Sequence, residues 1–288
     1  MTDIQKYFAP TSLDQAVECL KDGEVTILAG GTDLMPQSQA GKLKFKRTLM
    51  NIRRIPELIG VARQGGDICI GALTTITELM DDALVQRHLP VLADACDHFA
   101  SDQIRNTATL GGNICNASPA GDTLIPLLVL DARVELASQA KGKLRWRSLP
   151  LAEFFTGPGK TRRAPNELLV GVRIPQPVPG RIASFHKSGT RPALDISTVS
   201  IGIAGTLRKD ALFDVRVAFG AVAPTPVRAP RTEQALEGKR LDADGIARVA
   251  QIARDEVTPI DDVRASAWYR KELIHNMTKR MLAHVAHA

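Results

Sequence analysis

The sequence predicts an α+β fold, and three observations support this prediction. The first forty residues alternate strand, helix and strand, because a helical segment lies between two short apolar runs. The middle of the chain continues with a longer mixture of helices and strands. After residue 180, three strand-like runs precede three helical runs, which is typical of helices packed on one face of a sheet. With 288 residues, the chain is long enough to bury a substantial core.

The N-terminal helix is predicted from its cap, its apolar stripe and its end. Ser12 followed three residues later by Gln15 has the spacing of a capping box, and Gly23 is typical of a helix C-terminus. One helical face carries the apolar residues Leu13, Ala16, Val17 and Leu20. The following runs are predicted as a buried strand (VTILAGG), a turn with a short helical piece (TDLMPQSQAGKL) and another strand (RTLMNI).

The next segment, from about residue 55 to residue 175, is predicted to alternate strands and helices. Its apolar patterning predicts, in order, a strand (GDICIGALTTI), two helices (TITELMDDALV and LPVLADACDHFAS), a short helix with a strand (TLIPLLVLDARVEL) and two further strands (GKLRWRSL and NELLVGVRIP).

A Pro-rich run marks the boundary before the last unit. Pro175–Gly180 (PQPVPG) is the best linker candidate in the chain. Beyond it come three strands (RIASFHK, ISTVSIGIAGTL, FDVRVAFGAVA) and three helices (RTEQALEG, GIARVAQIARDEV, SAWYRKELIHNMTKRMLAHV). We therefore expect three units, at residues 1–54, 55–176 and 177–288.

Composition and charge exclude several classes of protein. An apolar fraction of 44% with 24% charged residues is ordinary for a globular chain. The net charge of +6 raises the question of nucleic acid, but aromatic residues make up only 4% and no nucleic-acid-binding motif is found. We therefore expect no nucleic-acid partner, and interpret the basic residues as a solvated face or one that meets an acidic ligand or partner. No apolar run reaches about 18 residues and no secretory signal is visible, so we expect a cytoplasmic protein without a transmembrane segment.

Metal and nucleotide motifs are also missing. Cys19, Cys69, Cys96 and Cys115 are scattered singly, without a C-x-x-C pair, so we expect no metal or iron–sulfur site in this chain. The run TGPGKT at 156–161 is similar to a phosphate-binding loop, but a Walker A motif needs glycine at position 154, where the chain has phenylalanine. We interpret it as an ordinary loop.

Two glycine pairs are the main functional signal. The first lies in LAGGTDLMP (28–36) and the second in TLGGNICNASPAGD (109–122). Glycine pairs allow positive φ angles and close backbone approach, and free N–H groups in such turns bind pyrophosphate oxygens. A single pair is more often structural. Two pairs, each with polar neighbours, favour two loops that hold one extended ligand such as a dinucleotide; those neighbours are Thr32, Asp33, Asn113, Asn116, Ser118 and Asp122.

No nucleophile or acid–base pair can be assembled from the sequence, so we assign no catalytic residue. A redox cofactor carries its own chemistry and needs from the protein only binding, orientation and electrostatic tuning.

These residues resemble a known family. ILAGGTDL, then QIRNTATLGGNICNASPAGD, NELLVGVRIP and SFHKSGTRPALDIS resemble the FAD-binding medium subunits of the molybdenum hydroxylases, the family of carbon monoxide and xanthine dehydrogenases. The resemblance covers essentially the whole chain. It implies a two-subdomain FAD-binding fold of the vanillyl-alcohol-oxidase and CO-dehydrogenase flavoprotein type. A C-terminal domain with a three-stranded antiparallel sheet and helices would follow.

The resemblance also implies roles for individual residues. The first segment would wrap the pyrophosphate of FAD and its surroundings: Ile27, Leu28, Ala29, Gly30, Gly31, Thr32, Asp33 and Leu34. The second would form another loop, with Thr109 and Asn113 as side-chain hydrogen-bonding groups: Thr109, Leu110, Gly111, Gly112 and Asn113. Further expected contacts are Phe99 packed on the cofactor, Ile114 and Cys115 near the flavin, and Asp122 on a polar group of the cofactor. Leu169 would pack near the adenine or ring end and Lys187 would lie by the isoalloxazine, with Arg191 and Asp195 as weaker candidates.

By the same resemblance, the chain would be an electron-transfer subunit. A molybdopterin-binding large subunit and a [2Fe–2S] small subunit would be its partners, in a dimer of heterotrimers. The chain would pass electrons through FAD to NAD, a quinone or oxygen. The extra [4Fe–4S] cluster of hydroxybenzoyl-CoA reductases would be absent, because no cysteine-bearing insertion is evident.

Two alternatives stay open at this point. The chain could be a non-redox assembly or storage protein with the same fold and an empty site, or a stand-alone flavin oxidoreductase. The intact polar residues beside both glycine pairs oppose the first, and the lack of a recognisable proton donor opposes the second. We further hypothesise that the basic residues Lys42, Lys44 and Lys46 help to dock an acidic neighbour.

Overall fold

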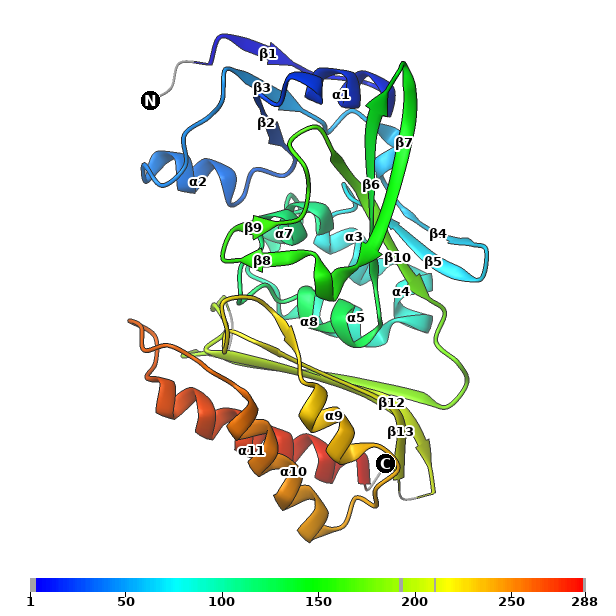
Figure 1. Ribbon diagram of the computed structural model, residues 1–288, viewed down its shortest axis with the longest axis vertical. Helices are drawn as coiled ribbons and strands as arrows, with labels where there is room; N and C mark the ends of the chain where they lie inside the picture. Colours follow the sequence, from blue (N-terminus) through cyan, green and yellow to red (C-terminus); the bar gives the residue numbers. More distant parts are fainter. Residues whose placement is uncertain (1–3, 192–193, 210, 287–288) are drawn as a thin grey trace.

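The computed structural model describes residues 4–191, 194–209 and 211–286. Three main sheets follow one another along the long axis of the molecule, with the N-terminal sheet at one end and the C-terminal helices at the other (Figure 1). This arrangement confirms the predicted mixture of helices and strands.

The N-terminal sheet is parallel and small. Its strands lie in the order β1 (Lys6–Phe8), β3 (Thr48–Asn51) and β2 (Val25–Leu28). Helix α1 (Leu13–Cys19) is capped by Ser12, which accepts a hydrogen bond from the Gln15 N–H, as predicted. The Gln15 side chain accepts from the Thr11 N–H rather than from that of Ser12, so the box is not reciprocal. A 3₁₀ turn (Leu20–Asp22) leads to Gly23 at φ +68°, and α2 (Leu34–Gln39) follows β2.

The second sheet is antiparallel and carries most of the helices. Its strands are β4 (Val61–Gln64), β5 (Asp67–Gly71), β10 (Leu168–Pro175), β6 (Arg133–Ala140) and β7 (Lys143–Pro150), in that spatial order. The helices between β5 and β6 are α3 (Ile76–Asp81), α4 (Ala83–His88), α5 (Pro90–Asp97), α6 (Asp102–Arg105), α7 (Leu110–Asn116) and α8 (Leu124–Val129). Two 3₁₀ turns (Pro56–Leu58 and Leu151–Glu153) and the hairpin of β8 (Phe155–Gly157) and β9 (Lys160–Thr161) complete the unit.

One predicted helix is divided in two. The sequence analysis expects a single helix through TITELMDDALV, but α3 ends at Asp81 and α4 begins at Ala83. The carboxylate of Asp82 accepts hydrogen bonds from the N–H groups of Leu84 and Val85, at 2.8 and 3.0 Å, and so starts a new helix.

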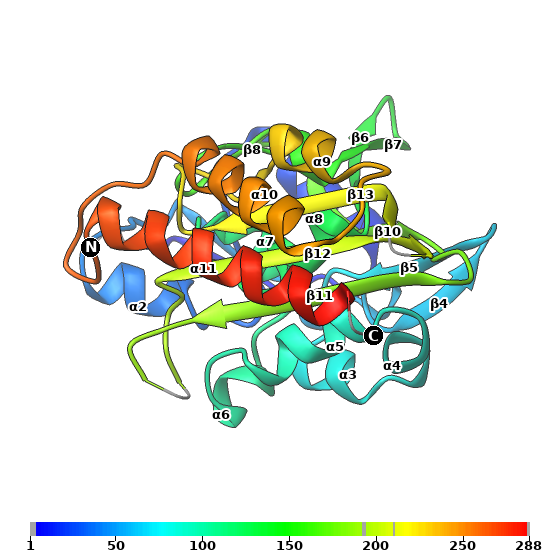
Figure 2. The same cartoon turned by 90° about the horizontal axis from the view of Figure 1, so that it is seen from below.

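The third sheet is antiparallel and has helices on one face. Strands β11 (Arg181–Ser188), β12 (Val199–Arg208) and β13 (Ala211–Gly220) match the prediction, and a short β14 (Val227–Arg228) adds a fourth strand that is too brief to show a sequence pattern. Helices α9 (Pro230–Leu236), α10 (Ala243–Glu256) and α11 (Ala267–Ala286) cover the sheet from below (Figure 2).

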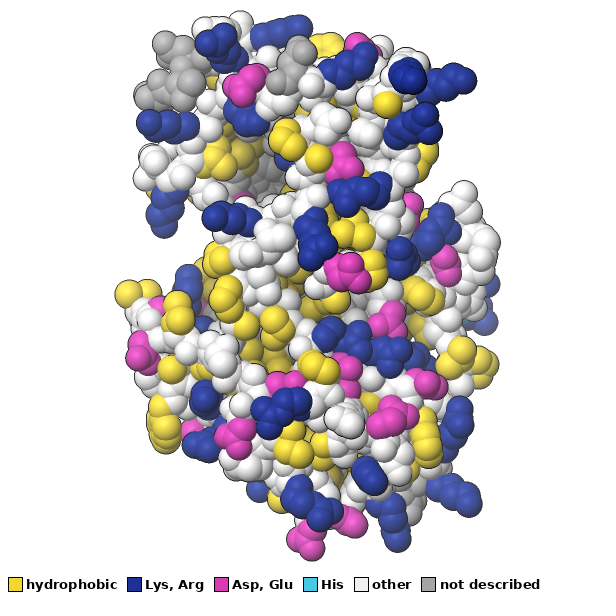
Figure 3. Space-filling model, viewed as in Figure 1, with side chains coloured by type: hydrophobic (Ala, Val, Ile, Leu, Met, Phe, Trp, Pro, Cys, Tyr) yellow, Lys and Arg dark blue, Asp and Glu magenta, His cyan; other side chains and the backbone are white. Residues whose placement is uncertain are grey.

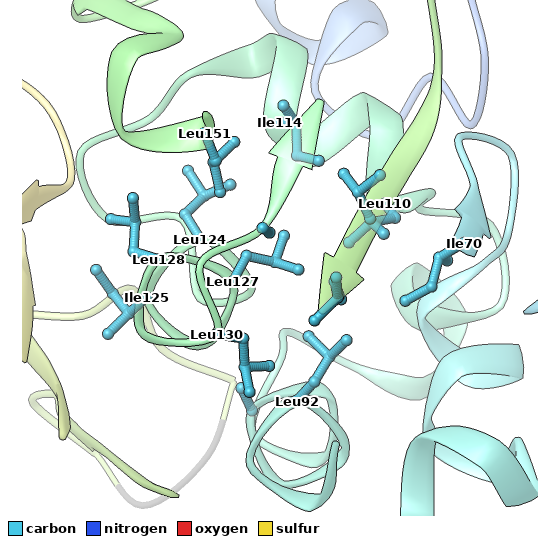
Figure 4. Packing of buried hydrophobic residues seen from close by; sticks show 14 of the residues in the cluster. Ile70, Leu92, Leu110, Ile114, Leu124, Ile125, Leu127, Leu128, Leu130 and Leu151 are labelled. Atoms are coloured by element: carbon cyan, nitrogen blue, oxygen red, sulfur yellow. The ribbon is translucent and has the colours of Figure 1, made fainter. Parts of the chain in front are cut away.

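Two of the three core clusters cross a boundary between units. The largest cluster of buried apolar side chains fills the space around α7 and α8 (Figure 4) and extends to Ala204 and Ala218 of the third sheet. A second cluster lies under α10 and α11, and a third joins the N-terminal sheet to Leu73, Ala137 and Leu168 of the second unit. The units therefore hold one another in place, which matters for a site built between them.

Candidate functional site

A cavity of about 360 Å³ lies between the N-terminal sheet and the second unit. Its wall combines the segment from β2 to α2, helix α7 with its N-cap, and the loop between β9 and β10. In the space-filling view, the surface is hollowed below the N-terminal elements (Figure 3). A cavity of this size and mixed polarity is typical of a small-molecule site.

The first glycine pair combines a close packing contact with a turn. A Cβ atom on Gly30 would lie 2.1 Å from the carbonyl oxygen of Thr107, so only glycine fits at this position. Gly31 has φ +79°, a left-handed conformation that other residues adopt at a cost. The first pair is therefore packed directly against the chain that leads into the second.

This turn leaves a run of backbone donors free. The N–H groups of Gly30, Gly31, Thr32 and Asp33 have no acceptor among the residues that the structure describes, and all four residues line the cavity. Consecutive free N–H groups in a concave turn form a binding site for an anion such as a pyrophosphate.

The second glycine pair differs from the expected loop, because it forms the first turn of α7. Thr109 is the N-cap, and its Oγ1 accepts from the Gly112 N–H at 3.1 Å. The other N–H groups are also used: Leu110 donates to Thr74, Gly111 to Ala72 and Asn113 to Thr109. This segment therefore offers a ligand its side chains and Cα atoms but none of these N–H groups.

Asn113 keeps part of its amide available. Its Oδ1 accepts from the Thr123 hydroxyl at 2.7 Å, while its Nδ2 donor has no partner within the described part of the chain. Gln37 of α2, which also lines the cavity, donates to Asn116 Oδ1 at 3.0 Å and ties α2 to α7. A direct hydrogen bond between two units therefore forms part of the cavity wall.

Basic and acidic side chains both line the cavity. Lys46 and Arg163 bring positive charge. Burial raises the pKa of the Asp33 carboxyl above its usual value. Burial also raises the pKa of the Cys115 thiol, against the opposing charge of Arg163, so this cysteine is a neutral wall residue.

The remaining wall is largely apolar. Apolar side chains from several elements form it: Val25, Ile27, Leu43, Ile52, Phe99, Leu168 and Leu169. Free N–H donors and two cations suit an anionic linker, and apolar walls suit flat ring systems. The residues present therefore fit a flavin dinucleotide, which combines one diphosphate with two aromatic ring systems.

A second polar network lies next to the cavity. Lys187 Nζ donates to Asp122 Oδ2 at 2.7 Å and to the His98 carbonyl at 3.0 Å, and the Ser197 hydroxyl donates to Asp122 Oδ1 at 2.8 Å. Burial raises the pKa of the Asp122 carboxyl, although Lys187 and Ser197 act in the opposite direction. The network joins the second unit to β11 and to the segment before β12.

Most of the site residues predicted from the sequence line this one cavity: Ile27, Ala29, Gly30, Gly31, Thr32, Asp33, Leu34, Phe99, Thr109, Gly111, Gly112, Asn113, Cys115 and Leu169. The others lie outside its lining. Leu28 is half-buried in β2, and Leu110 and Ile114 are fully buried in the core around α7 (Figure 4). Asp122 and Lys187 pair with each other, and Lys187 borders a separate cavity with Arg191 and Asp195.

Sequence reasoning missed several cavity residues, notably Gln37, Lys46, Gly159 and Arg163. Lys46 belongs to the basic run KLKFKR (42–47), for which the sequence analysis proposes only docking of an acidic neighbour. Arg163 ends a second basic run, KTRR (160–163). Nothing local distinguishes them from their basic neighbours, because their position depends on how distant segments pack.

Within residues 4–191, 194–209 and 211–286, no group of three or more His, Cys, Asp or Glu side chains is arranged to hold a metal ion. Across the same described residues, no helix combines the length and the apolar character needed to cross a membrane.

Two family models match the chain in tandem. Residues 2–177 match the FAD binding domain in molybdopterin dehydrogenase, and residues 183–285 match the CO dehydrogenase flavoprotein C-terminal domain. Together they cover almost the whole chain.

Individual proteins agree with these matches over nearly their whole lengths. The xanthine dehydrogenase FAD-binding subunit of Escherichia coli O157:H7 is 35% identical over 98% of this chain and 96% of its own length. The carbon monoxide dehydrogenase medium chain of Hydrogenophaga pseudoflava is 31% identical over 96% and 95%. A solved structure of carbon monoxide dehydrogenase from the same organism superimposes with a TM-score of 0.91 at 30% identity, covering 97% of this chain and 96% of that one. The predicted fold, a flavoprotein of the CO-dehydrogenase type, is confirmed.

Proposed function

This chain belongs to the family of FAD-binding subunits of molybdenum-dependent dehydrogenases, and from that premise we propose that it relays electrons from a partner subunit to a terminal acceptor. In this proposal, a [2Fe–2S] small subunit donates the electrons, and NAD, a quinone or oxygen receives them. FAD, when bound, supplies the redox chemistry, because its flavin ring accepts and releases electrons. The chain's own residues bind and orient it.

The assignment of residues follows from the cavity. The free N–H groups of Gly30–Asp33 take the diphosphate, and the side chains of Thr109 and Asn113 supply hydrogen bonds from the opposite segment. The apolar wall encloses the ring systems and excludes water from them. Lys187 and Asp122 hold the neighbouring surface of β11 against the second unit.

The names of the relatives, an FAD-binding subunit and a medium chain, support a proposal about partners. We propose a molybdopterin-binding large subunit and a [2Fe–2S] small subunit, assembled as a dimer of heterotrimers in the cytoplasm. We also propose units at residues 1–54, 55–176 and 177–288, since each of these ranges contains one of the three main sheets.

The observation that carries the binding part of this proposal is the run of cavity-wall N–H groups that have no acceptor among the described residues. The test is the visible absorption spectrum of the full chain, with identification of any cofactor released on denaturation. We expect flavin bands and released FAD, or uptake of added FAD by the colourless chain.

The electron path needs a second measurement. Purified chain would be combined with the molybdenum and iron–sulfur subunits, and flavin absorbance followed after substrate is added. Bleaching that requires both partners supports the relay. A chain that stays colourless with added FAD, alone and with its partners, contradicts the proposal.

A further inference from the structure

Of the two cations that line the cavity, Arg163 is the more buried and its side chain makes more hydrogen bonds. It lies in the loop between β9 and β10, and its Nη1 donates to the carbonyl oxygens of Ala164 at 3.1 Å and Glu167 at 2.6 Å. These two bonds fix the plane of the guanidinium. Its Nε and Nη2 donors have no acceptor in the described part of the chain, so they remain for a ligand.

The loop that holds Arg163 is itself shaped by a buried carboxylate. Glu167 Oε2 accepts from the Ala164 N–H at 2.7 Å and closes the turn between these residues. Arg147 of β7 pairs with both carboxylate oxygens of Glu167, at 2.8 and 2.7 Å, and also donates to the Arg162 carbonyl. The ion pair of Arg147 with Glu167 therefore supports the turn that carries the two carbonyl groups bonded to Arg163.

The ion pair between Glu167 and Arg147 stays charged at neutral pH. Burial raises the pKa of the Glu167 carboxyl, but the hydrogen bonds from Arg147 and from the Ala164 N–H outweigh that effect, and the pKa lies below its usual value. Glu167 therefore stays ionised, and the pair with Arg147 is present throughout the physiological range.

The other lining cation is placed differently. Lys46 is exposed, and its ammonium group already donates to the Gly23 carbonyl. Arg163 is half-buried, and a guanidinium fork pairs with phosphate oxygens through two parallel hydrogen bonds. A flavin dinucleotide carries its negative charge only on the diphosphate.

We propose that Arg163 binds the diphosphate of the dinucleotide together with the N–H groups of Gly30–Asp33, and that Glu167 is the positioning residue that holds it there. This inference rests on the proposed function, because it assigns the site to FAD. It adds a binding residue and its support, neither of which the sequence analysis identifies.

The test compares flavins with and without a phosphate group. Full-length chain stripped of cofactor would be titrated with FAD and with riboflavin, as wild type and as Arg163→Gln. The matched control is Arg162→Gln, the exposed neighbour whose side chain does not line the cavity. We expect Arg163→Gln to weaken FAD binding about 10- to 100-fold, the range of one or two charge-assisted hydrogen bonds, with riboflavin and the control unchanged.

Two further measurements distinguish direct binding by Arg163 from positioning by Glu167. Added salt should weaken FAD binding to the wild type more than to Arg163→Gln, because the variant has lost one cation at the anion site. Glu167→Gln should weaken FAD binding less than Arg163→Gln, and the double variant should be no weaker than Arg163→Gln alone, since Glu167 acts through Arg163.

Several outcomes would overturn the inference. An unchanged FAD affinity in Arg163→Gln, an equal loss for FAD and riboflavin, or an unaltered salt dependence would each show that Arg163 does not bind the diphosphate. Additive losses in the double variant would remove the positioning role of Glu167. A wild-type chain that binds no FAD, either alone or combined with its partner subunits, overturns the proposed function instead, so the two failures are distinguishable.

Discussion

Two glycine pairs, Gly30–Gly31 and Gly111–Gly112, line the same cavity and look alike in the sequence, but their backbone N–H groups are used differently. The first pair forms a turn after β2, and its N–H groups have no acceptor among the residues that the structure describes. The second forms the first turn of α7, where the N–H groups bond to Ala72 and to Thr109. One pair is a donor surface, and the other is a packing surface.

The difference shows that a glycine pair has two separable physical uses. At Gly111 a Cβ atom would lie 2.7 Å from the Cβ and carbonyl oxygen of Ala72, so the missing side chain permits contact between segments. Gly30 likewise permits close contact with Thr107, whereas Gly31 allows the backbone to adopt a left-handed φ. The two glycine pairs differ in φ and in the hydrogen bonding of their N–H groups. Alanine substitutions at matched positions can therefore test which property each glycine supplies.

The largest effect is expected from Gly111→Ala. The new Cβ would collide with Ala72 and force α7 away from the second sheet, at a cost of about 3 kcal/mol in the free energy of unfolding. Urea denaturation of the cofactor-free chain measures this cost. A loss below about 0.5 kcal/mol would show that the second pair is not a packing surface.

Gly31→Ala should affect stability less and cofactor binding more. Alanine at φ +79° costs about 1–2 kcal/mol, and relief of that strain would turn the free N–H groups away from the cavity. We expect FAD affinity to fall about tenfold, the equivalent of one hydrogen bond.

The control for this variant is Gly41→Ala. Gly41 also has a left-handed φ, +71°, and has open space around it, but it lies outside the cavity. It should show a similar loss of stability in urea with unchanged FAD affinity. If both variants lose FAD equally, the free N–H groups are not the donor surface.

Thr109→Val tests the cap of the second segment. Removing Oγ1 leaves the Gly112 N–H without its acceptor, which should cost about 1 kcal/mol in thermal or urea unfolding. Thr109→Ser keeps the hydroxyl and should recover most of this loss. Failure of serine to recover it would assign the effect to side-chain packing.

The smallest effect is expected from Gly112→Ala. Its Cβ would lie 2.9 Å from the Thr109 hydroxyl, a side-chain atom that can move, and alanine favours a helix over glycine by about 1 kcal/mol. Stability should therefore change by less than about 1 kcal/mol, and FAD affinity by less than threefold, as measured by the same titrations. A tenfold loss of FAD would show that this pair also acts through its backbone.

Much of the fold could be predicted from local patterns. The Ser12 cap, the Gly23 stop and the strands of the third sheet are confirmed, because each depends on residues within a few positions. The break between α3 and α4 and the short β14 were missed: Asp82 can cap or continue a helix, and two residues carry no periodicity.

The site was predicted in part for the same reason. The two glycine segments and most of the residues beside them line one cavity, while Leu28, Leu110, Asp122 and Lys187 lie outside its lining. Their contacts with a cofactor stay a prediction. Arg163 and Gln37 could not be found, because their neighbours in sequence give no sign that they face the cavity.

The sequence by itself determined which segments can turn, cap and pack, since glycine conformation, capping side chains and apolar spacing act over one or two turns of chain. Only the tertiary structure decided which N–H groups stay free and which cation meets them. Those outcomes depend on contacts between distant residues, such as Gly30 with Thr107, Gly111 with Ala72, and Arg147 with Glu167. The same dipeptide therefore became a donor surface at one position and a packing surface at the other.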